Sequence, residues 1–167
     1  MITAKLNKTP NPEVLFRNSE RYEGNGNFRD AFKCLLVAAE LGHVGSQINL
    51  GNFYAWGKGT RRNPEKAAYW YKKAYTSGDS DGAHNLAIDR RNEGNIRSAV
   101  VWFKKAVAMN NGDSLIELAK IYKARRGGQK SASELLKRAL QLGRENISDA
   151  ERKEAKCLLE EMAKILK

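Results

Sequence analysis

Residues Gly45–Gly78 have the sequence GSQINLGNFYAWGKGTRRNPEKAAYWYKKAYTSG, and this stretch decides the fold. It predicts one helix over 44–56 and a second helix over about 63–77. The glycines of segment 57–59 separate the two helices, and an asparagine followed by a proline opens the second one. The stretch therefore predicts a helical hairpin.

The spacing of this hairpin recurs on both sides along the chain. Pairs of alanines seven positions apart occur at Ala31/Ala38, Ala67/Ala74, Ala99/Ala106 and Ala132/Ala139. Four positions after each pair comes a glycine or asparagine that can end a helix in the left-handed conformation, namely Gly42, Gly78, Asn110 and Gly143. Successive pairs lie 36, 32 and 33 positions apart, and such a period with two helices per repeat predicts an α-solenoid. Alanine at these stations lets a neighbouring helix approach closely.

The best-preserved unit also carries a specific set of residues: Leu50-Gly51, Tyr54, Gly57, Gly59, Pro64, Lys66-Ala67, Trp70, Lys73-Ala74 and Gly78. This set resembles the Sel-one-like repeat, a relative of the tetratricopeptide repeat. Weaker units follow, a degenerate one precedes, and the resemblance covers about Gly26–Gly143. It implies an all-α fold, a right-handed α-solenoid of stacked antiparallel helix pairs.

The length of 167 residues suits one domain with a continuous core. Within a single domain over 1–167, we expect residues 1–10 to be flexible, 26–143 to form the recognisable repeats and 148–167 to form a capping helix. Capping boxes, Ser131-x-x-Glu134 and Ser148-x-x-Glu151, predict where the last two helices begin.

The chain shows neither an apolar run of about 20 residues nor an apolar N-terminal segment, so we expect a cytoplasmic protein without a membrane partner. Cys34 and Cys157 each lie among apolar residues of a predicted helix. Two buried thiols are expected, with a disulfide or redox role as the alternative.

Positive charge is concentrated in the middle of the chain. Of a net charge of +11, the segment Lys58–Arg138 holds 18 lysines and arginines against 8 acidic residues. Arginine pairs occur near the ends of successive first helices, at Arg61-Arg62, Arg90-Arg91 and Arg125-Arg126. Because a solenoid stacks equivalent stations, they predict a basic surface for an acidic partner. The alternative is plain solvation and compensation of helix dipoles.

The resemblance implies that the first helix of each pair lines a concave face that holds ligands. Counting stations gives the candidate partner contacts Asn49, Asn52, Phe53, Trp56, Asn85, Asp89, Asn92 and Lys120. Asparagine can donate to and accept from an extended backbone at once, although solvation explains each one alone. Trp56 adjoins a turn and has small or polar equivalents, so it is expected to be exposed, as a binding anchor or a packing lid.

No catalytic, cofactor-binding or metal-binding constellation is found in the sequence. His43 and His84 occupy non-equivalent stations and are expected in turns or on the surface. The glycine-rich turns do not follow predicted strands, so they are not phosphate-binding loops.

These observations favour a non-catalytic protein-interaction adaptor with an acidic protein partner. A narrower hypothesis is a cognate immunity or antitoxin protein that neutralises a bacterial toxin or effector. One alternative is a nucleic-acid-binding module that uses the basic face, although Trp70 and Trp102 occupy expected core stations. The other, implied by the resemblance, is a weak hydrolase of β-lactams, because some secreted members of the family bind penicillin-like ligands. Those members carry a cysteine pattern that this chain lacks.

Overall fold

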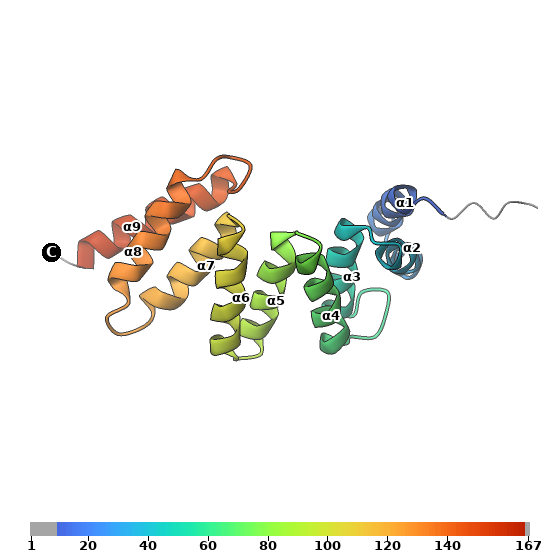
Figure 1. Cartoon of the computed structure of the whole chain (residues 1–167), viewed down its shortest axis with the longest axis horizontal. Coiled ribbons are helices and arrows are strands. Elements are labelled where there is room, and N and C mark those ends of the chain that lie inside the picture. Colours follow the sequence, from blue (N-terminus) through green and yellow to red (C-terminus); the bar gives the residue numbers. More distant parts are fainter. Residues whose placement is uncertain (1–9, 166–167) are drawn as a thin grey trace, which may run out of the picture. The chain divides into compact units, whose positions relative to one another are not determined.

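The computed structural model describes residues 10–165, which form nine α-helices and no strand (Figure 1). The helices are α1 (Pro12–Gly24), α2 (Phe28–Glu40), α3 (Val44–Trp56), α4 (Pro64–Thr76), α5 (Ser80–Asn92), α6 (Ile96–Ala108), α7 (Gly112–Lys123), α8 (Gln129–Gln141) and α9 (Asp149–Ile165). The predicted all-α fold is confirmed. The segment expected to be flexible, 1–10, lies outside the described residues except for Pro10.

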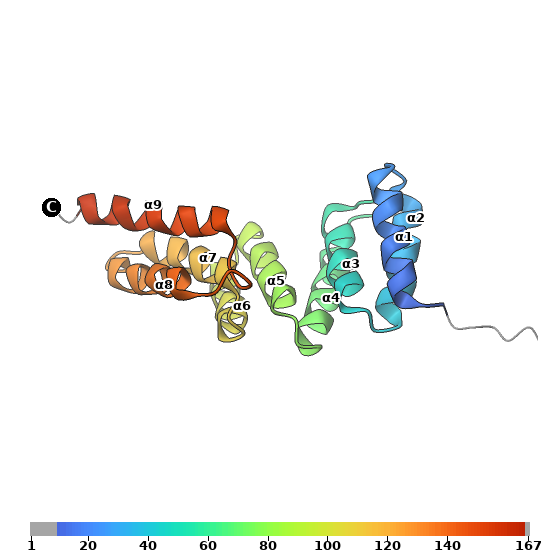
Figure 2. The ribbon, with the colours of Figure 1, turned by 90° about the horizontal axis from the view of Figure 1, so that it is seen from above.

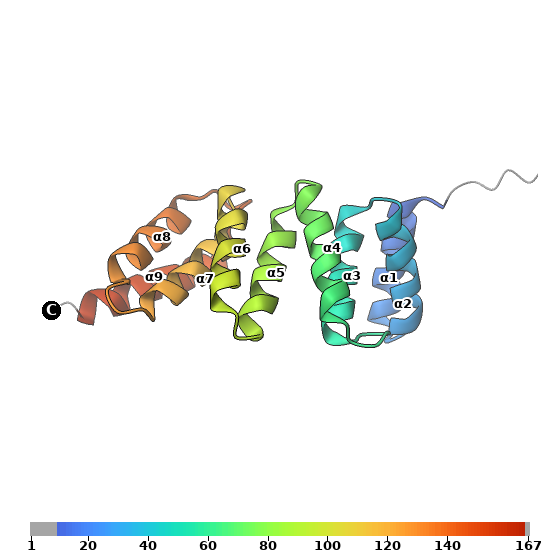
Figure 3. The ribbon, with the colours of Figure 1, turned by 60° about the horizontal axis from the view of Figure 1, so that its bottom comes forward.

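The helices group into two compact units, and the division between Lys73 and Ala74 falls inside α4. In the first unit α1 pairs with α2, α2 packs on α3, and α3 lies beside α4 (Figure 3). In the second unit α5 pairs with α6 and α7 with α8, while α6 packs on α7. The last helix, α9, runs along α7 and α8 (Figure 2). Each unit thus has the stacked helix pairs of an α-solenoid.

The repeated alanines occupy the interior, as predicted. All eight have 0% of their surface exposed: Ala31, Ala38, Ala67, Ala74, Ala99, Ala106, Ala132 and Ala139. In the second unit Ala132 and Ala139 share a core with Leu136 from α8 and with Ala155 and Met162 from α9. The apolar face of α9 therefore covers the last helix pair, which is the role expected of a capping helix.

Three of the four predicted helix stops adopt the left-handed conformation. Gly42 and Gly78 have φ values of 95° and 92°, and Asn110 has a φ of 63°. Asn110 is the only residue other than glycine with positive φ among the described residues, and asparagine tolerates this region better than most. The prediction is wrong for Gly143, because α8 ends instead at an extended Leu142.

Helix starts depend on side-chain caps, and one of the two predicted capping boxes forms. Ser148 donates from its backbone N–H to Glu151 at 2.9 Å, and Glu151 donates from its N–H to the Ser148 Oγ at 3.3 Å. The box predicted from Ser131 is wrong. Helix α8 begins two residues earlier, at Gln129, after Gly128, which supplies no side-chain cap.

Gly51 sets the contact between α3 and α4. A Cβ atom built on Gly51 would lie 2.6 Å from Cδ1 of Tyr71, well inside normal contact distance. The Tyr71 ring is buried and its hydroxyl donates to Oδ1 of Asn52 at 2.7 Å, so the ring has little room to move. Only a residue without a side chain fits at this crossing.

We expect Gly51→Ala to lower the free energy of unfolding by about 1–3 kcal/mol, because the added methyl group overpacks the α3–α4 contact. Gly24→Ala is the matched control. Gly24 ends α1 with open space around its Cβ position, and alanine there is expected to be neutral or slightly stabilising. Chemical denaturation measures both, and equal stabilities would contradict the assigned crossing.

Candidate protein-binding surface

The first candidate surface belongs to α3, where Asn49, Asn52 and Trp56 lie three and four positions apart and so share one helical face. Trp56 ends the helix with 71% of its surface exposed, which confirms its predicted exposure. Asn49 and Asn52 are half-buried. The Asn52 oxygen accepts the Tyr71 hydroxyl, and its amide nitrogen has no hydrogen-bond partner among the described residues.

Phe53 does not belong to this surface. It is 2% exposed and packs in the core of the first unit, with the Lys58 Nζ 5.5 Å from its ring centroid. The helical spacing that places Phe53 near Asn52 and Trp56 also turns it toward the neighbouring helix. Its inclusion among the partner contacts is corrected for this reason.

The second candidate surface lies in the second unit, on α5 and α7. Asn85 and Asp89 are half-buried along α5, and Asn92 is exposed at its end. Lys120 on α7 is half-buried and forms ion pairs with two carboxylates, Glu117 at 2.9 Å and Glu154 at 2.7 Å. The Lys120 charge is therefore balanced within the protein.

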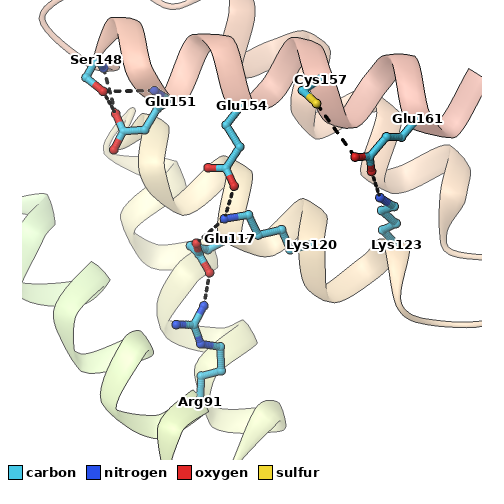
Figure 4. Close-up of polar contacts among 9 residues, drawn as sticks. All are labelled: Arg91, Glu117, Lys120, Lys123, Ser148, Glu151, Glu154, Cys157 and Glu161. Atoms are coloured by element: carbon cyan, nitrogen blue, oxygen red, sulfur yellow. Dashed lines mark hydrogen bonds and ion pairs between the residues drawn. The ribbon is translucent and has the colours of Figure 1, made fainter.

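Glu117 is the centre of a network that joins three helices (Figure 4). It binds Lys120 from its own helix and Arg91 from α5, while Lys120 continues to Glu154 on α9. The sequence did not indicate Glu154, because only the fold brings α9 beside α7. The network holds the helices of this unit together more than it offers charge to a partner.

A pocket of about 380 Å³ opens beside this network. Its lining combines charged residues at the rim with apolar ones: Arg91, Ile96, Glu117, Lys120, Ile121, Ala124 and Arg125. Ile96 comes from the start of α6 and carries no signal in the sequence. The pocket could accept an apolar side chain of a bound segment.

The three predicted arginine pairs differ in their surroundings. Arg90 and Arg91 are half-buried and form ion pairs with Glu93 and Glu117, respectively. Exposed arginines occur at the other two stations, Arg61, Arg62, Arg125 and Arg126. The side chain of Arg125 lies over its neighbour Tyr122, 5.5 Å from the ring centroid. The positive charge is therefore neutralised at one of the three arginine pairs, Arg90-Arg91.

The profile of the Sel1 repeat family matches residues 22–43, 44–79 and 81–111, which is more than half of the chain. The chain belongs to the Sel1 repeat family. The matches cover the helices from the end of α1 to α6, whereas α7 and α8 repeat the hairpin without being matched. At the level of the family, the chain is a helical-repeat protein.

Solved structures show the same fold. A Sel1 repeat protein from Oxalobacter formigenes superposes with a TM-score of 0.68 at 20% identity, covering 82% of this chain and 60% of that one. The protective antigen c5321 of uropathogenic Escherichia coli, described as displaying an SLR fold, has a TM-score of 0.68 at 16% identity, covering 80% of this chain and 31% of that one. The immunity protein Pa5087 from Pseudomonas aeruginosa has a TM-score of 0.59 at 21% identity, covering 78% of this chain and 53% of that one. The chain therefore spans less than two thirds of each of these proteins.

The two histidines have structural partners in the Sel1 repeats. His43 caps α3 as predicted for a turn residue, accepting the Ser46 N–H at Nδ1 over 3.1 Å. His84 was expected in a turn or on the surface, but it lies within α5, bonded to Ser114 at 2.9 Å. Burial lowers its pKa. Among residues 10–165, no three histidines, cysteines or carboxylates gather as a metal site would require.

Cys34 is half-buried and Cys157 is exposed on α9, so the expectation of two buried thiols is wrong for Cys157; both are free. Trp70 is buried, and Trp102 is half-buried beneath the Lys105 Nζ, 3.9 Å from its ring centroid. None of the described helices has the length and apolarity that crossing a bilayer requires.

A carboxyl pair joins α7 to α9. Burial and a hydrogen bond with Glu151 raise the pKa of Asp113 to about 7, so this carboxyl keeps a proton in slightly acidic solution and loses it above neutral pH. Asp113 and Glu151 line a pocket of about 420 Å³. Asp81 lines the same pocket, and burial raises its pKa as well. We therefore expect the contact between the capping helix and the last helix pair to weaken as pH rises.

We expect the free energy of unfolding to fall by about 1 kcal/mol as pH rises from about 5 to 8. The expected change is this small because solvent reaches the pair and screens its charges. Folded Asp113 binds a proton that the unfolded chain has already released in this range, so deprotonation favours unfolding. His84 acts in the opposite sense, because its pKa is lowered in the folded state.

Asp113→Asn isolates the effect, because its amide can donate to Glu151 at every pH. Its unfolding free energy is expected to fall less between pH 5 and 8 than that of the wild type, whereas the exposed-site control Asp149→Asn keeps the wild-type slope. Parallel profiles for Asp113→Asn and the wild type would show that the pKa of Asp113 is not raised.

Proposed function

We propose that the chain is a non-catalytic binding module whose Sel1 repeats hold a protein partner on the exposed faces of their first helices. The observation that carries this proposal is Trp56, which leaves 71% of a large aromatic surface in water at the end of α3. Tryptophan is enriched among the residues that dominate binding energy at protein interfaces. An exposed tryptophan beside polar groups on one helix face suits such an interface.

The polar groups beside Trp56 suit recognition of an extended backbone. The half-buried Asn49 and Asn52 project from the same face, and Asn52 keeps donor groups without a partner among the described residues. Half-burial limits the rotamers of a side chain, so less freedom is lost when a partner binds. Tryptophan would supply affinity in this arrangement and the asparagines would fix the register of the partner.

For the partner we propose an acidic protein, and more narrowly a bacterial toxin or effector that binding neutralises. The net charge of +11 supports an acidic partner, because long-range attraction accelerates encounter. The immunity protein Pa5087 shares the fold at 21% identity, so it offers a precedent for the scaffold alone. The immunity role of this chain is our inference.

We expect Trp56→Ala to weaken binding to the native partner by about 2 kcal/mol, because it removes the aromatic anchor. The partner would be isolated from the native cell with the wild-type chain and identified by mass spectrometry, and its affinity then measured by calorimetry. Tyr69→Ala is the matched control. Tyr69 is also an exposed aromatic residue, at 58%, but it lies on α4, outside the candidate face.

The immunity role makes a separate prediction about growth. Expression of the isolated partner alone should arrest bacterial growth, and co-expression of the wild-type chain, but not of Trp56→Ala, should restore it. A partner that binds without harming growth would reject the immunity role and leave the binding module standing. Recovery of nucleic acid in place of a stoichiometric protein, with affinity that falls steeply with salt, would favour the nucleic-acid alternative.

A further inference from the structure

A further cavity lies in the first unit, between α2 and the connection from α3 to α4, and none of Asn49, Asn52 and Trp56 lines it. It measures about 600 Å³. Its lining joins aromatic, aliphatic and basic residues: Phe32, Leu36, Tyr54, Thr60, Arg61, Arg62, Asn63, Pro64, Glu65 and Lys66. Neither the repeats nor the proposed binding face accounts for this combination, which we call the basic pocket.

Part of the basic pocket is apolar. The rings of Phe32 and Tyr54 meet edge to face with centroids 5.3 Å apart, and Leu36 extends this surface along α2. The Tyr54 ring is buried and Phe32 is half-buried, so the rings form a fixed floor. Such a floor accepts one apolar side chain better than it accepts a polar one.

Three cations stand at the pocket and are not neutralised. Arg61, Arg62 and Lys66 are exposed, and none forms an ion pair with a carboxylate of the described residues. Glu65 is the only acidic residue in the lining. In the second unit, by contrast, Arg91 and Lys120 form ion pairs with carboxylates of the protein itself. The Lys66 Nζ lies over the Tyr54 ring, 5.3 Å from its centroid, and no carboxylate of the described residues neutralises its charge.

The loop that carries the cations is held in place. Lys58 forms an ion pair with Glu23 of α1, and its Nζ lies 4.6 Å from the ring centroid of Phe28. The Asn63 N–H donates to the Tyr54 carbonyl at 2.8 Å, and the Arg62 Nε donates to the Ala55 carbonyl at 3.1 Å. The pocket is therefore largely formed before a ligand arrives, which lowers the cost of binding.

We propose that the basic pocket binds an acidic peptide segment of the protein partner, with one aromatic or large aliphatic side chain on the Phe32–Tyr54 floor and flanking carboxylates at Arg61 and Lys66. This inference rests on the proposed function, because it assigns the pocket to the same partner. Bidentate contact suits arginine and carboxylate, and Lys66 adds a point charge at the opening of α4.

The observations favour a peptide over a nucleic acid. Bases stack on open aromatic faces, whereas Tyr54 is buried and its ring is nearly perpendicular to that of Phe32. A single pocket with an apolar floor also differs from the continuous basic groove that tracks a strand.

The test uses the full chain and a fluorescein-labelled peptide of sequence Asp-Glu-Phe-Glu-Asp, with binding followed by fluorescence anisotropy. We expect Arg61→Gln and Lys66→Gln each to raise the Kd about tenfold, as loss of one charged hydrogen bond predicts. Lys72→Gln is the matched control. Lys72 is exposed on α4 and lies outside the pocket, so the same loss of charge should change Kd less than twofold. Circular dichroism checks that each variant is folded.

Two companion probes locate the binding energy. Replacing the peptide phenylalanine by alanine should weaken binding several-fold if the floor is used, and a uridine-rich single-stranded RNA should compete poorly. Equal weakening by Lys72→Gln, no effect of the alanine peptide, or efficient competition by the RNA would each overturn the proposal. The isolated native partner separates the two inferences: if Trp56→Ala loses it while Arg61→Gln and Lys66→Gln retain it, the pocket assignment fails and the proposed function stands.

Discussion

Close approach between helices at small residues is the constraint on which the rest of this structure depends. The eight repeated alanines are completely buried, and at Gly51 the neighbouring Tyr71 ring leaves no room even for a methyl group. Enlarging a side chain in a close-packed interior destabilises the protein. The small residues at each crossing therefore determine how closely the two helices pack. The surface that a pair presents, including the exposed end of α3, follows from where these crossings lie.

The packing of the helices determines which cations are paired with carboxylates and which are not. The sequence concentrates cations over the repeats, yet α5, α7 and α9 combine theirs with Glu117 and Glu154 in an internal network. At the connection between α3 and α4, Arg61 and Lys66 have no carboxylate partner among the described residues. An exposed ion pair contributes little stability, but it removes charge from the field that a partner meets. The basic character relevant to binding is therefore local.

The first unit brings together the features that favour recognition of a protein. Trp56 provides an exposed aromatic anchor at the end of α3, and the basic pocket adds an apolar floor with unneutralised cations. Both are placed by the same connection, whose loop is fixed by Lys58 and Asn63. A fixed loop loses little entropy on binding, which suits a module that works by holding a partner. The second unit adds a contact at Asp113 and Glu151, where burial raises the pKa of Asp113 to about 7.

The sequence by itself determined the helices, their hairpin pairing and the burial of the alanines, because local capping and a repeated spacing are encoded in neighbouring positions. It also indicated the exposure of Trp56. Only the tertiary structure decided that Phe53 turns inward, that α9 delivers Glu154 to Lys120, and that Phe32 and Tyr54 form the floor beneath Arg61. These features depend on contacts between residues far apart in the chain. A helical period specifies which positions share a face, but the neighbouring helix determines whether that face is buried, neutralised or free.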